Sequence, residues 1–493
     1  MSVLAFDLGA GSGRALLGEI ESGNIRVTEV HRFANEPVRV GGRLHWDVLR
    51  LFHEIKQGIL KAKHAGHRPQ SIGIDSWAVD FGLLDRNGEL LGNPYHYRDP
   101  HTDHVMEEAY RIMPAGEIFA RTGIQLMQFN TLFQLYAMKR ADSVALEHAA
   151  ALLMIPDLLR YFLTGEKVSE FTNASTTQML DPGAKSWDKD MMGRFGIPTG
   201  LFVPIVEPGT KVGRLTAAVS EELGVGRIPV IAVAEHDTAS AVAGVPADRQ
   251  DFAYLICGTW SLLGTELEAP VVHEQAYAWN FTNEGGVGGT FRLLKNMAGT
   301  WLIQECRRIW AVEGKHYEHG ELVRLAEEAP PFQAWIDPDD AMFLSPRHMP
   351  AQIQHYCRST GQAVPQTAGE MMRTVLESLA FQCRFVLERT QRLSGREFPG
   401  LHMVGGGIRN ELLAQLTANA IGKPVWAGPA EASALGNMAV QWIALGEIGT
   451  LEEARAMIRA SFPPVAYEPE RNDDWERAYR KFLQVAEAGR QAN

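Results

Sequence analysis

A histidine and an aspartate stand next to each other in the stretch V-A-E-H-D-T-A-S-A-V-A-G, residues 233–244. A carboxylate such as Asp237 can accept the proton of a substrate hydroxyl, and His236 beside it can donate or accept a hydrogen bond. The same aspartate could instead cap a helix that begins near Thr238, which is a common role for this residue type. The stretch alone leaves catalysis and helix capping both open.

The residues before this pair indicate where it lies in a fold. Residues 228–234, I-P-V-I-A-V-A, form a continuous apolar run that is typical of a strand buried on both faces. Open α/β sheets bind ligands beyond the carboxyl ends of their strands, and Glu235-His236-Asp237 follows this strand directly. The small residues after Asp237 would let a helix approach closely. This position favours a catalytic role for Asp237.

A glycine-rich turn near the N-terminus has the composition of an anion-binding loop. In D-L-G-A-G-S-G-R, residues 7–14, glycines can bring backbone N–H groups close to an anion, and Ser12 and Arg14 add a hydroxyl and a cation. Asp7 could hold Mg²⁺ through water. The segment lacks the G-K-[ST] ending of a P-loop, and a strand is predicted to follow it. A tight hairpin turn without a ligand is the alternative.

Two later loops have a similar composition. In residues 253–267 an apolar strand meets G-T-W-S and a second strand follows, so Thr259 could contact a phosphate, with a plain turn as the alternative. Residues 401–421 predict a strand, three glycines and a helix, an arrangement that suits a flat ligand such as adenosine. The alternative is a helix N-terminus packed on a sheet, which often binds anions as well. The first and second loops lie about 250 residues apart, which suggests two halves built alike.

Strand and helix patterns alternate along the rest of the chain, so the sequence predicts an α/β architecture. The clearest further segments are a hairpin over residues 71–85, helices over 49–65 and 369–393, and a last helix that carries Trp475, Tyr479 and Phe482 on one face. We predict domains at residues 1–245 and 246–465, followed by a C-terminal helix within 466–493 that docks on the body.

Composition and charge narrow the class of protein. The chain has 493 residues, of which 45% are hydrophobic and 22% charged, as is usual for globular proteins of several domains. Its formal net charge is −12 and no basic stripe stands out, which argues against a nucleic-acid partner. No uncharged apolar run is long enough for a membrane span, and the N-terminus does not have the pattern of a signal peptide. The four cysteines show no metal-ligand spacing, so we expect reduced thiols in a cytoplasmic protein.

The order of these motifs resembles that of the sugar kinase, actin and heat-shock chaperone ATPase superfamily, and within it the FGGY carbohydrate kinases. Asp7 and Gly9 match the first phosphate motif, and Gly405–Gly407 match the adenosine motif. The closer resemblance runs from residue 7 to residue 437. It rests on D-L-G-A-G-S-G-R, H-W-D-V (45–48), S-I-G-I-D-S-W-A-V-D-F, N-T-L-F-Q-L (130–135), T-N-A-S-T-T-Q (172–178), A-E-H-D-T-A-S-A-V, G-T-W-S-L-L-G, N-F-T-N-E-G-G (280–286), L-K-N-M-A-G-T-W-L-I-Q (294–304) and V-G-G-G.

The resemblance implies two ribonuclease H-like, actin-type ATPase domains with a cleft between them. It implies transfer of the γ-phosphoryl group of ATP to the 1-hydroxyl of L-rhamnulose, a step of L-rhamnose catabolism, with Mg²⁺ as cofactor and Asp237 as general base. A kinase for L-fuculose or a pentulose is the near alternative, and a nucleotide-dependent switch of the actin or chaperone type has less support. The expected partners are a small ketose and ATP, and the sequence makes no prediction of the oligomeric state.

The resemblance also assigns residues one by one. The implied ATP contacts are Ala10, Gly11, Ser12, Gly13, Arg14, Thr259, Gln304 and Gly406. The implied sugar contacts are Ala78, His236, Asp237, Thr238 and Asn296. Ala78 departs from the pattern, in which a glycine follows the tryptophan, so an extra methyl group would alter any backbone contact with the sugar. Asn296 could instead cap a helix over 297–303, and Gln304 could be a solvated helix residue. Trp77 is expected near the sugar.

Overall fold

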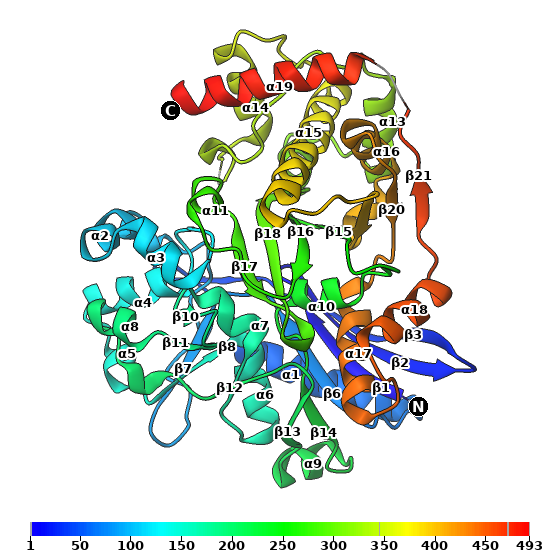
Figure 1. Cartoon of the computed structure of the whole chain (residues 1–493). Helices are drawn as coiled ribbons and strands as arrows, with labels where there is room; N and C mark the ends of the chain where they lie inside the picture. Colours follow the sequence, from blue (N-terminus) through cyan, green and yellow to red (C-terminus); the bar gives the residue numbers. More distant parts are fainter. Residues whose placement is uncertain (1, 345, 471–472, 493) are drawn as a thin grey trace. The chain divides into compact units, whose positions relative to one another are not determined.

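The computed structural model describes residues 2–344, 346–470 and 473–492 (Figure 1). It divides the chain into two compact units, each assembled from three stretches of sequence. The first unit comprises Met1–Asp248, Glu266–Leu293 and Ala432–Pro463, and the second comprises Arg249–Thr265, Leu294–Glu431 and Pro464–Asn493. These units differ from the contiguous ranges 1–245 and 246–465, because residues 432–463 fold back onto the first unit and pack on its sheet.

A six-stranded mixed sheet lies at the centre of the first unit. Its strand order is β13-β14-β6-β1-β2-β3, with bounds Thr210–Arg214, Pro229–Ala232, Ile72–Ser76, Ser2–Leu8, Ser12–Glu21 and Asn24–Ala34. The β1 strand pairs antiparallel with β2 and parallel with β6, and β6 pairs parallel with β14. The predicted strand–glycine turn–strand at the N-terminus is therefore confirmed. The carboxyl ends of β14, β6 and β1 lie at one edge of the sheet.

Helices cover both faces of this sheet, and strand alternation decides which side chains each face receives. Leu4, Phe6 and Leu8 of β1 belong to a core shared with α1 (Val48–His64), α6 (Ile155–Thr164) and α9 (Ala217–Leu223). Val3 and Ala5 belong to a second core shared with α17 (Ala432–Leu445) and α18 (Leu451–Ser461). Odd-numbered positions of β1 therefore face α17, which matters for Asp7.

The remaining elements of the first unit are mostly short. Its further helices are α2 (Val105–Ile112), α3 (Ala115–Thr122), α4 (Thr131–Arg140), α5 (Val144–His148), α7 (Phe171–Ala174), α8 (Lys189–Arg194), α10 (Asp237–Ala243) and α11 (Glu274–Ala278). Its further strands are β4 (Val38–Val40), β5 (Arg43–His45), β7 (Phe81–Leu84), β8 (Ala151–Met154), β9 (Ser169–Glu170), β10 (Leu180–Asp181), β11 (Ser186–Trp187), β12 (Ile205–Val206) and β17 (Thr282–Gly285).

The predicted hairpin over residues 71–85 was wrong. Its two strands do form, but β6 joins the central sheet, whereas β7 pairs antiparallel with β8 in a separate sheet. The residues between the strands are buried, and the indole N–H of Trp77 donates to the Asp80 carboxylate at 3.0 Å. A solvent-exposed hairpin turn would leave these groups in water, so burial of the connection accounts for the separation of the two strands.

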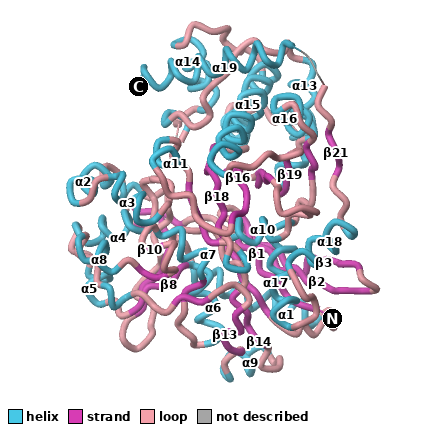
Figure 2. The backbone as a smooth tube through the Cα atoms, viewed as in Figure 1, coloured by secondary structure: helices cyan, strands magenta, loops and turns pink. Residues whose placement is uncertain are grey.

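The second unit repeats the strand–turn–strand pattern. Its strands β18 (Phe291–Ala298), β16 (Trp260–Leu267), β15 (Ala253–Cys257), β19 (Leu401–Val404), β20 (Val425–Ala427) and β21 (Val465–Tyr467) follow one another across a sheet in that order. Its helices are α12 (Trp301–Val312), α13 (His319–Glu328), α14 (Met349–Ser359), α15 (Ala368–Ser394), α16 (Glu411–Ile421) and α19 (Asp473–Ala492). Figure 2 shows the long α15 and α16 next to the β19–β20 strands.

The last helix docks within the second unit, as predicted. Trp475, Tyr479 and Phe482 of α19 are buried, and their rings lie 5.5, 5.7 and 5.6 Å from the ring of Phe381 on α15. All four cysteines are free and buried, which agrees with the predicted thiols. None of the helices in the described residues is both long and apolar enough to cross a membrane.

In the first unit, α10 and α17 cross at unusually short range (Figure 1). A Cβ atom added at Gly436 of α17 would lie 1.7 Å from the backbone oxygen of Ser240 on α10. One added at Gly244 would lie 2.2 Å from the backbone oxygen of Ala432. The two helices can therefore approach this closely only with glycine at both positions, and the contact fixes the carboxyl-terminal half of α10 against α17.

We predict that Gly436→Ala lowers the stability of the protein. The new methyl group meets backbone, which cannot rotate away, so the overpacking should cost about 1–3 kcal/mol or more. Gly193→Ala in α8 is the matched control, because a Cβ there meets nothing within 4 Å. Urea unfolding of the three proteins measures the difference. A Gly436→Ala protein as stable as the Gly193→Ala protein would contradict the close crossing.

Candidate active site

Three aspartates lie at the carboxyl ends of three neighbouring parallel strands in the first unit. Asp7 is in β1, Asp75 is in β6, and Asp237 follows β14. Asp7 and Asp75 are direct partners in the parallel register of β1 and β6. An isolated bridge between Ser76 and His236 extends the pairing of β6 toward Asp237. Acidic groups are thus gathered where open α/β sheets bind their ligands.

Asp75 is the most deeply buried of the three, with 0% exposure. Its Oδ2 accepts a hydrogen bond from Asn437 Nδ2 of α17 at 2.6 Å, whereas its Oδ1 has no hydrogen-bond partner. Burial, followed by repulsion from Asp7, holds the pKa of Asp75 well above its ordinary value. A carboxyl group in this position is costly to ionise, so it is an exception that calls for a functional reason.

Asp7 lies against the cation of the glycine-rich turn. Arg14 Nη2 donates to Asp7 Oδ2 at 2.5 Å, because the antiparallel register of β1 and β2 places the two residues opposite each other. The turn itself is closed by a hydrogen bond from Gly9 N to Ser12 O at 2.9 Å. Gly11 and Ser12 are exposed, and a Cβ at Gly11 would meet nothing within 4 Å. The exposed part of the turn therefore has room for an anion.

Gly13 has a different reason to be glycine. A Cβ at this position would lie 2.2 Å from the ring of Phe33, so Gly13 is required by packing within the sheet. Ala10, which also belongs to the predicted phosphate turn, is half-buried and packs on the core beneath β1. The turn thus combines packing residues with the exposed residues Gly11 and Ser12.

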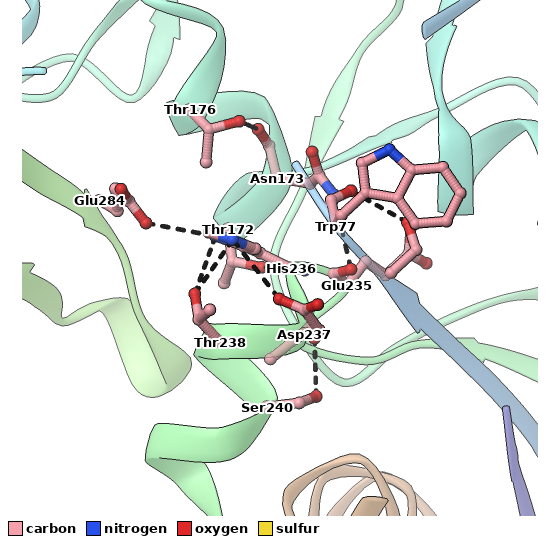
Figure 3. Close-up of polar contacts among 12 residues, drawn as sticks. Trp77, Thr172, Asn173, Thr176, Glu235, His236, Asp237, Thr238, Ser240 and Glu284 are labelled. Atoms are coloured by element: carbon pink, nitrogen blue, oxygen red, sulfur yellow. Dashed lines mark hydrogen bonds and ion pairs between the residues drawn. The ribbon is translucent and has the colours of Figure 1, made fainter. Parts of the chain in front are cut away.

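Asp237 stands at the first turn of α10, with its side chain 23% exposed (Figure 3). Its Oδ1 lies 3.6 Å from Nε2 of His236. Burial raises the pKa of Asp237, the neighbouring Asp7 adds to this, and His236 and Arg292 oppose it. A carboxylate with a raised pKa and partial exposure is suited to accept a proton near neutral pH.

The alternative role of Asp237 as the helix cap is not what the structure shows. The residue at the N-cap of α10 is His236, and its side chain makes no capping hydrogen bond. Asp237 is already inside the first turn, where a negative charge interacts favourably with the helix dipole. The backbone N–H of Thr238 also interacts with this carboxylate and lowers its pKa, against the larger effect of burial.

The backbone before Asp237 is held by a buried polar network. Thr172 Oγ1 accepts from the backbone N–H of His236 at 3.1 Å, and Glu170 Oε2 accepts from the backbone N–H of Glu235 at 3.1 Å. Arg160 Nε donates to Glu235 Oε1 at 2.7 Å, and both side chains are almost completely buried. Burial raises the pKa of Glu170 to about 7. The T-N-A-S-T-T-Q motif thus anchors the strand end that carries Asp237.

Ala78 lies in the buried connection between β6 and β7. The residue with a left-handed backbone there is Val79, at φ 66°, and Ala78 is not among the residues with positive φ. Position 78 therefore does not require glycine for its conformation. Burial raises the pKa of Asp80 to about 7, although Gln134, Trp46 and Trp77 all donate to its carboxylate. Trp77 was expected near the sugar. Its indole N–H donates a hydrogen bond to Asp80.

In the second unit, Thr259 and Gln304 come together at the β15–β16 turn. Thr259 Oγ1 lies 3.4 Å from Gln304 Oε1, and Gln304 Nε2 donates to Thr300 Oγ1 at 3.1 Å. Thr300 N donates to Gly258 O at 2.9 Å, so the N-terminus of α12 is tied to the turn. Gln304 is exposed, as a solvated helix residue would be, and it lies beside Thr259.

The triple glycine follows β19, which is the parallel neighbour of β15. Gly405 has φ 89°, and a Cβ at Gly407 would lie 2.2 Å from Sγ of Cys257, two residues before Thr259. A Cβ at Gly406, by contrast, would meet nothing within 4 Å. The outer glycines are therefore required by backbone and packing, whereas Gly406 borders open space beside the same strand end as Thr259.

The alternative role of Asn296, as the cap of a helix over 297–303, was wrong. Asn296 lies in β18, which ends at Ala298, and α12 begins only at Trp301. The predicted helix over 297–303 therefore starts later. Met297 and Ala298 still belong to the strand, and Gly299 fits tightly against Gly258 O. Asn296 is half-buried in the second unit.

Several functional candidates were missed by reading the sequence. Asp75 belongs to one of the sequence motifs but was given no role. It alternates with Ile72 and Ile74 along β6, so its side chain lies on the other face of the sheet, which is the face of Asp7. Asn437, Glu284 and Arg292 were also missed. Glu284 is part of the quoted N-F-T-N-E-G-G motif, which was the available signal, whereas nothing in the sequence indicated that Arg292 would be buried.

Comparisons with known proteins agree with this arrangement. Residues 2–244 match the N-terminal domain, and residues 253–445 the C-terminal domain, of the FGGY family of carbohydrate kinases. A protein of Bacteroides thetaiotaomicron named Rhamnulokinase is 46% identical over 97% of this chain and 98% of its own length. One of Halalkalibacterium halodurans with the same name is 43% identical over 94% of this chain and 98% of its own length.

Solved structures share the fold at lower identity. A ligand-bound xylulose kinase from Lactobacillus acidophilus has a TM-score of 0.82 at 18% identity, over 100% of this chain and 98% of its own. A Plasmodium falciparum glycerol kinase with ADP has a TM-score of 0.78 at 16% identity, over 98% and 97%. With both halves of the chain matched by one family and close relatives along nearly its whole length, this protein belongs to the FGGY family of carbohydrate kinases.

Proposed function

We propose that this kinase transfers the γ-phosphoryl group of ATP to the 1-hydroxyl of L-rhamnulose. The observation that carries the chemistry is the partly exposed Asp237, which follows β14 and lies near Asp7 and Asp75. The choice of sugar is supported by the similarity to relatives named Rhamnulokinase. ATP is the second substrate, and L-rhamnulose 1-phosphate and ADP are the products.

Asp237 acts as the general base in this proposal. It accepts the proton of the 1-hydroxyl as the oxygen attacks the γ-phosphorus, and the bond from that phosphorus to the bridging oxygen of ADP breaks. His236 and Thr238, which flank Asp237, would hydrogen-bond the ketose. Asn296 and the backbone at Ala78 remain proposed sugar contacts, and the extra methyl at Ala78 would narrow the space there.

The nucleotide is assigned to the two glycine-containing turns and to the triple glycine. In the first unit, Ala10, Gly11, Ser12, Gly13 and Arg14 would lie along the phosphates through backbone N–H groups and the guanidinium. In the second unit, Thr259 and Gln304 would contact the phosphates, and Gly406 would lie under the adenosine because its surface is open. Each assignment follows the type of contact that the local geometry permits.

The acidic cluster fits a divalent cation. Arg14 donates to Asp7, and the buried Oδ1 of Asp75 has no hydrogen-bond partner. Oxygen donors of this kind suit Mg²⁺, which keeps several waters and binds through one or two carboxylates. Asp7, through water, is the residue that would hold Mg²⁺, with Asp75 behind it. When bound, the ion would neutralise charge on the phosphates of ATP.

A panel of acceptors tests the proposed reaction. We expect ADP release to depend on added sugar, with the highest kcat/KM for L-rhamnulose among L-rhamnulose, L-fuculose, D-xylulose and glycerol. Phosphorus-31 NMR should show coupling of the product phosphate to the protons on C1. Preference for another ketose would overturn the choice of sugar. Slow hydrolysis of ATP that is independent of sugar would overturn the kinase activity.

We predict that Asp237→Asn abolishes most of the phosphoryl transfer while the protein stays folded. The amide keeps the size of the carboxylate but cannot accept a proton, and removal of a general base costs about 10²–10⁴ in rate. Asp47→Asn is the matched control, since Asp47 caps α1 by accepting from Arg50 N at 3.1 Å and asparagine caps about as well. Steady-state kinetics and thermal melting of both variants separate the roles. An active Asp237→Asn enzyme would overturn the assignment of Asp237 as the general base.

We predict that Gly406→Val weakens ATP binding and leaves ketose binding intact. The side chain enters space that is open in the protein alone, so folding should survive and the new methyl groups should meet the nucleotide instead. A tenfold rise in the ATP dissociation constant corresponds to about 1.4 kcal/mol, and we expect at least this change by calorimetry. Gly320→Val is the control, because its site is also open. Equal ATP affinity in the two variants would remove Gly406 from the nucleotide site.

A further inference from the structure

The N-F-T-N-E-G-G motif brings a buried ion pair to the side of His236 that faces away from Asp237. Glu284 lies in β17, and Arg292 lies at the start of β18. Arg292 is completely buried, and its Nη2 donates to Glu284 Oε2 at 3.0 Å. A guanidinium carries its charge permanently, so it can be buried only if its donors find acceptors.

The three nitrogens of the Arg292 guanidinium each contact an acceptor within the first unit. Nε donates to Gly285 O at 2.8 Å, which fixes the plane of the fork on the backbone. Nη1 donates to Thr238 Oγ1 at 2.8 Å. Nη2, besides Glu284, lies 3.2 Å from Nδ1 of His236. One rigid fork therefore contacts both residues that flank Asp237 in the sequence.

We infer that Arg292 is a positioning residue that holds His236 as the neutral imidazole with its proton on Nε2, directed toward the Asp237 carboxylate. The inference rests on the proposed function, because it concerns the base of that reaction. Arg292 lies outside the D-T-A-S segment, and in this inference it sets the tautomer of His236, a predicted sugar contact.

The tautomer follows from what each neighbour is able to do. Arg292 can only donate, so its bond to Nδ1 requires a lone pair on that nitrogen. The hydroxyl of Thr238 accepts from Arg292 and lies 3.1 Å from Nδ1 and 3.0 Å from Nε2 of His236, so it can donate to either ring nitrogen or accept from it and does not distinguish the tautomers. A proton on Nδ1 would face the N–H donor of Arg292. It would also direct the lone pair of Nε2 toward Asp237 Oδ1, 3.6 Å away, and two lone pairs repel.

Glu284 is the only neighbour that favours the opposite arrangement. Its Oε2 lies 3.2 Å from Nδ1, at a distance that a proton on this nitrogen could bridge. The same oxygen accepts from Arg292 Nη2 at 3.0 Å, however, and this bond is assisted by charge on both partners. Figure 3 shows Glu284 and Asp237 at different nitrogens of the His236 ring and Thr238 in contact with both nitrogens. Arg292 therefore holds the ring at Nδ1, and Nε2 is the nitrogen nearer to Asp237.

The charges around Asp237 agree with this role. Burial raises the pKa of Asp237 and Asp7 raises it further, whereas Arg292, whose charge is permanent, lowers it. Asp75, which faces the group from β6, also interacts with it repulsively. An Nε2–H group beside the carboxylate stabilises its ionised form, which is the form that accepts a proton.

The wild-type protein gives the first test. Nitrogen-15 chemical shifts of a neutral imidazole distinguish the protonated nitrogen from the unprotonated one, and a His236→Gln variant assigns the signals. We expect protonated Nε2 and unprotonated Nδ1 at neutral pH. A proton on Nδ1, or a doubly protonated ring, would overturn the inference without any variant of Arg292.

The second test replaces the fork but keeps its charge. In Arg292→Lys a single ammonium cannot reach Gly285 O, Thr238 and Nδ1 together. We expect His236 to become a mixture of tautomers and kcat to fall up to about 100-fold, as for a misplaced catalytic group. The KM for ATP should not change.

Arg455→Lys is the matched control. Arg455 is also buried in the first unit, where it pairs with Glu266 at 2.6 Å and donates to Val242 O at 2.9 Å, away from His236. It should lose comparable stability without a change in the His236 spectrum or in kcat. Identical kinetics of the two lysine variants would overturn the positioning role. If Asp237→Asn is inactive but Arg292→Lys behaves like Arg455→Lys, only this inference fails and the proposed function stands.

Discussion

The parallel register of β14, β6 and β1 is the constraint on which the active-site region depends. Hydrogen bonding between parallel strands fixes which residues lie side by side, so Asp7 and Asp75 are neighbours whatever their charges prefer. Repulsion between carboxylates in a buried region would separate them in a flexible loop, but not in a sheet whose two faces are packed by helices. The sheet thus supplies the free energy that holds like charges together.

The same register gives the three aspartates different surroundings. Arg14 balances Asp7 from the antiparallel strand β2, and Asn437 gives Asp75 a neutral partner from α17. The carboxylate of Asp237 interacts with the backbone N–H of Thr238 and with the charge of Arg292, and it retains partial exposure. The carboxylate that is left accessible is therefore the one that can exchange a proton with a substrate, and the other two shape the potential around it.

The strands, their glycine turns and the position of Asp237 could be predicted because they depend on local patterns. A continuous apolar run ending in Glu235-His236-Asp237 indicates a buried strand and its carboxyl end without reference to the rest of the chain. The hairpin over 71–85 failed for the opposite reason. The alternation of its residues was interpreted correctly. The choice of partner strand, however, depends on the buried Asp80 and its donors Trp46 and Gln134, which are 34 and 54 residues away from Asp80 in the sequence.

Arg292 shows the limit of sequence reading more sharply. An arginine in a strand pattern is normally taken as an exposed residue, and only the fold reveals that its guanidinium is buried against Glu284. A buried ion pair is weak evidence for stability, because hydrophobic residues of similar size often serve as well. Its retention is easier to understand where the fork has a geometric task. At Arg292 that task is to present three directed N–H groups to Gly285, Thr238 and His236, which an apolar side chain cannot do. The need to fix an imidazole beside Asp237 thus accounts for a charge in the most buried part of this region.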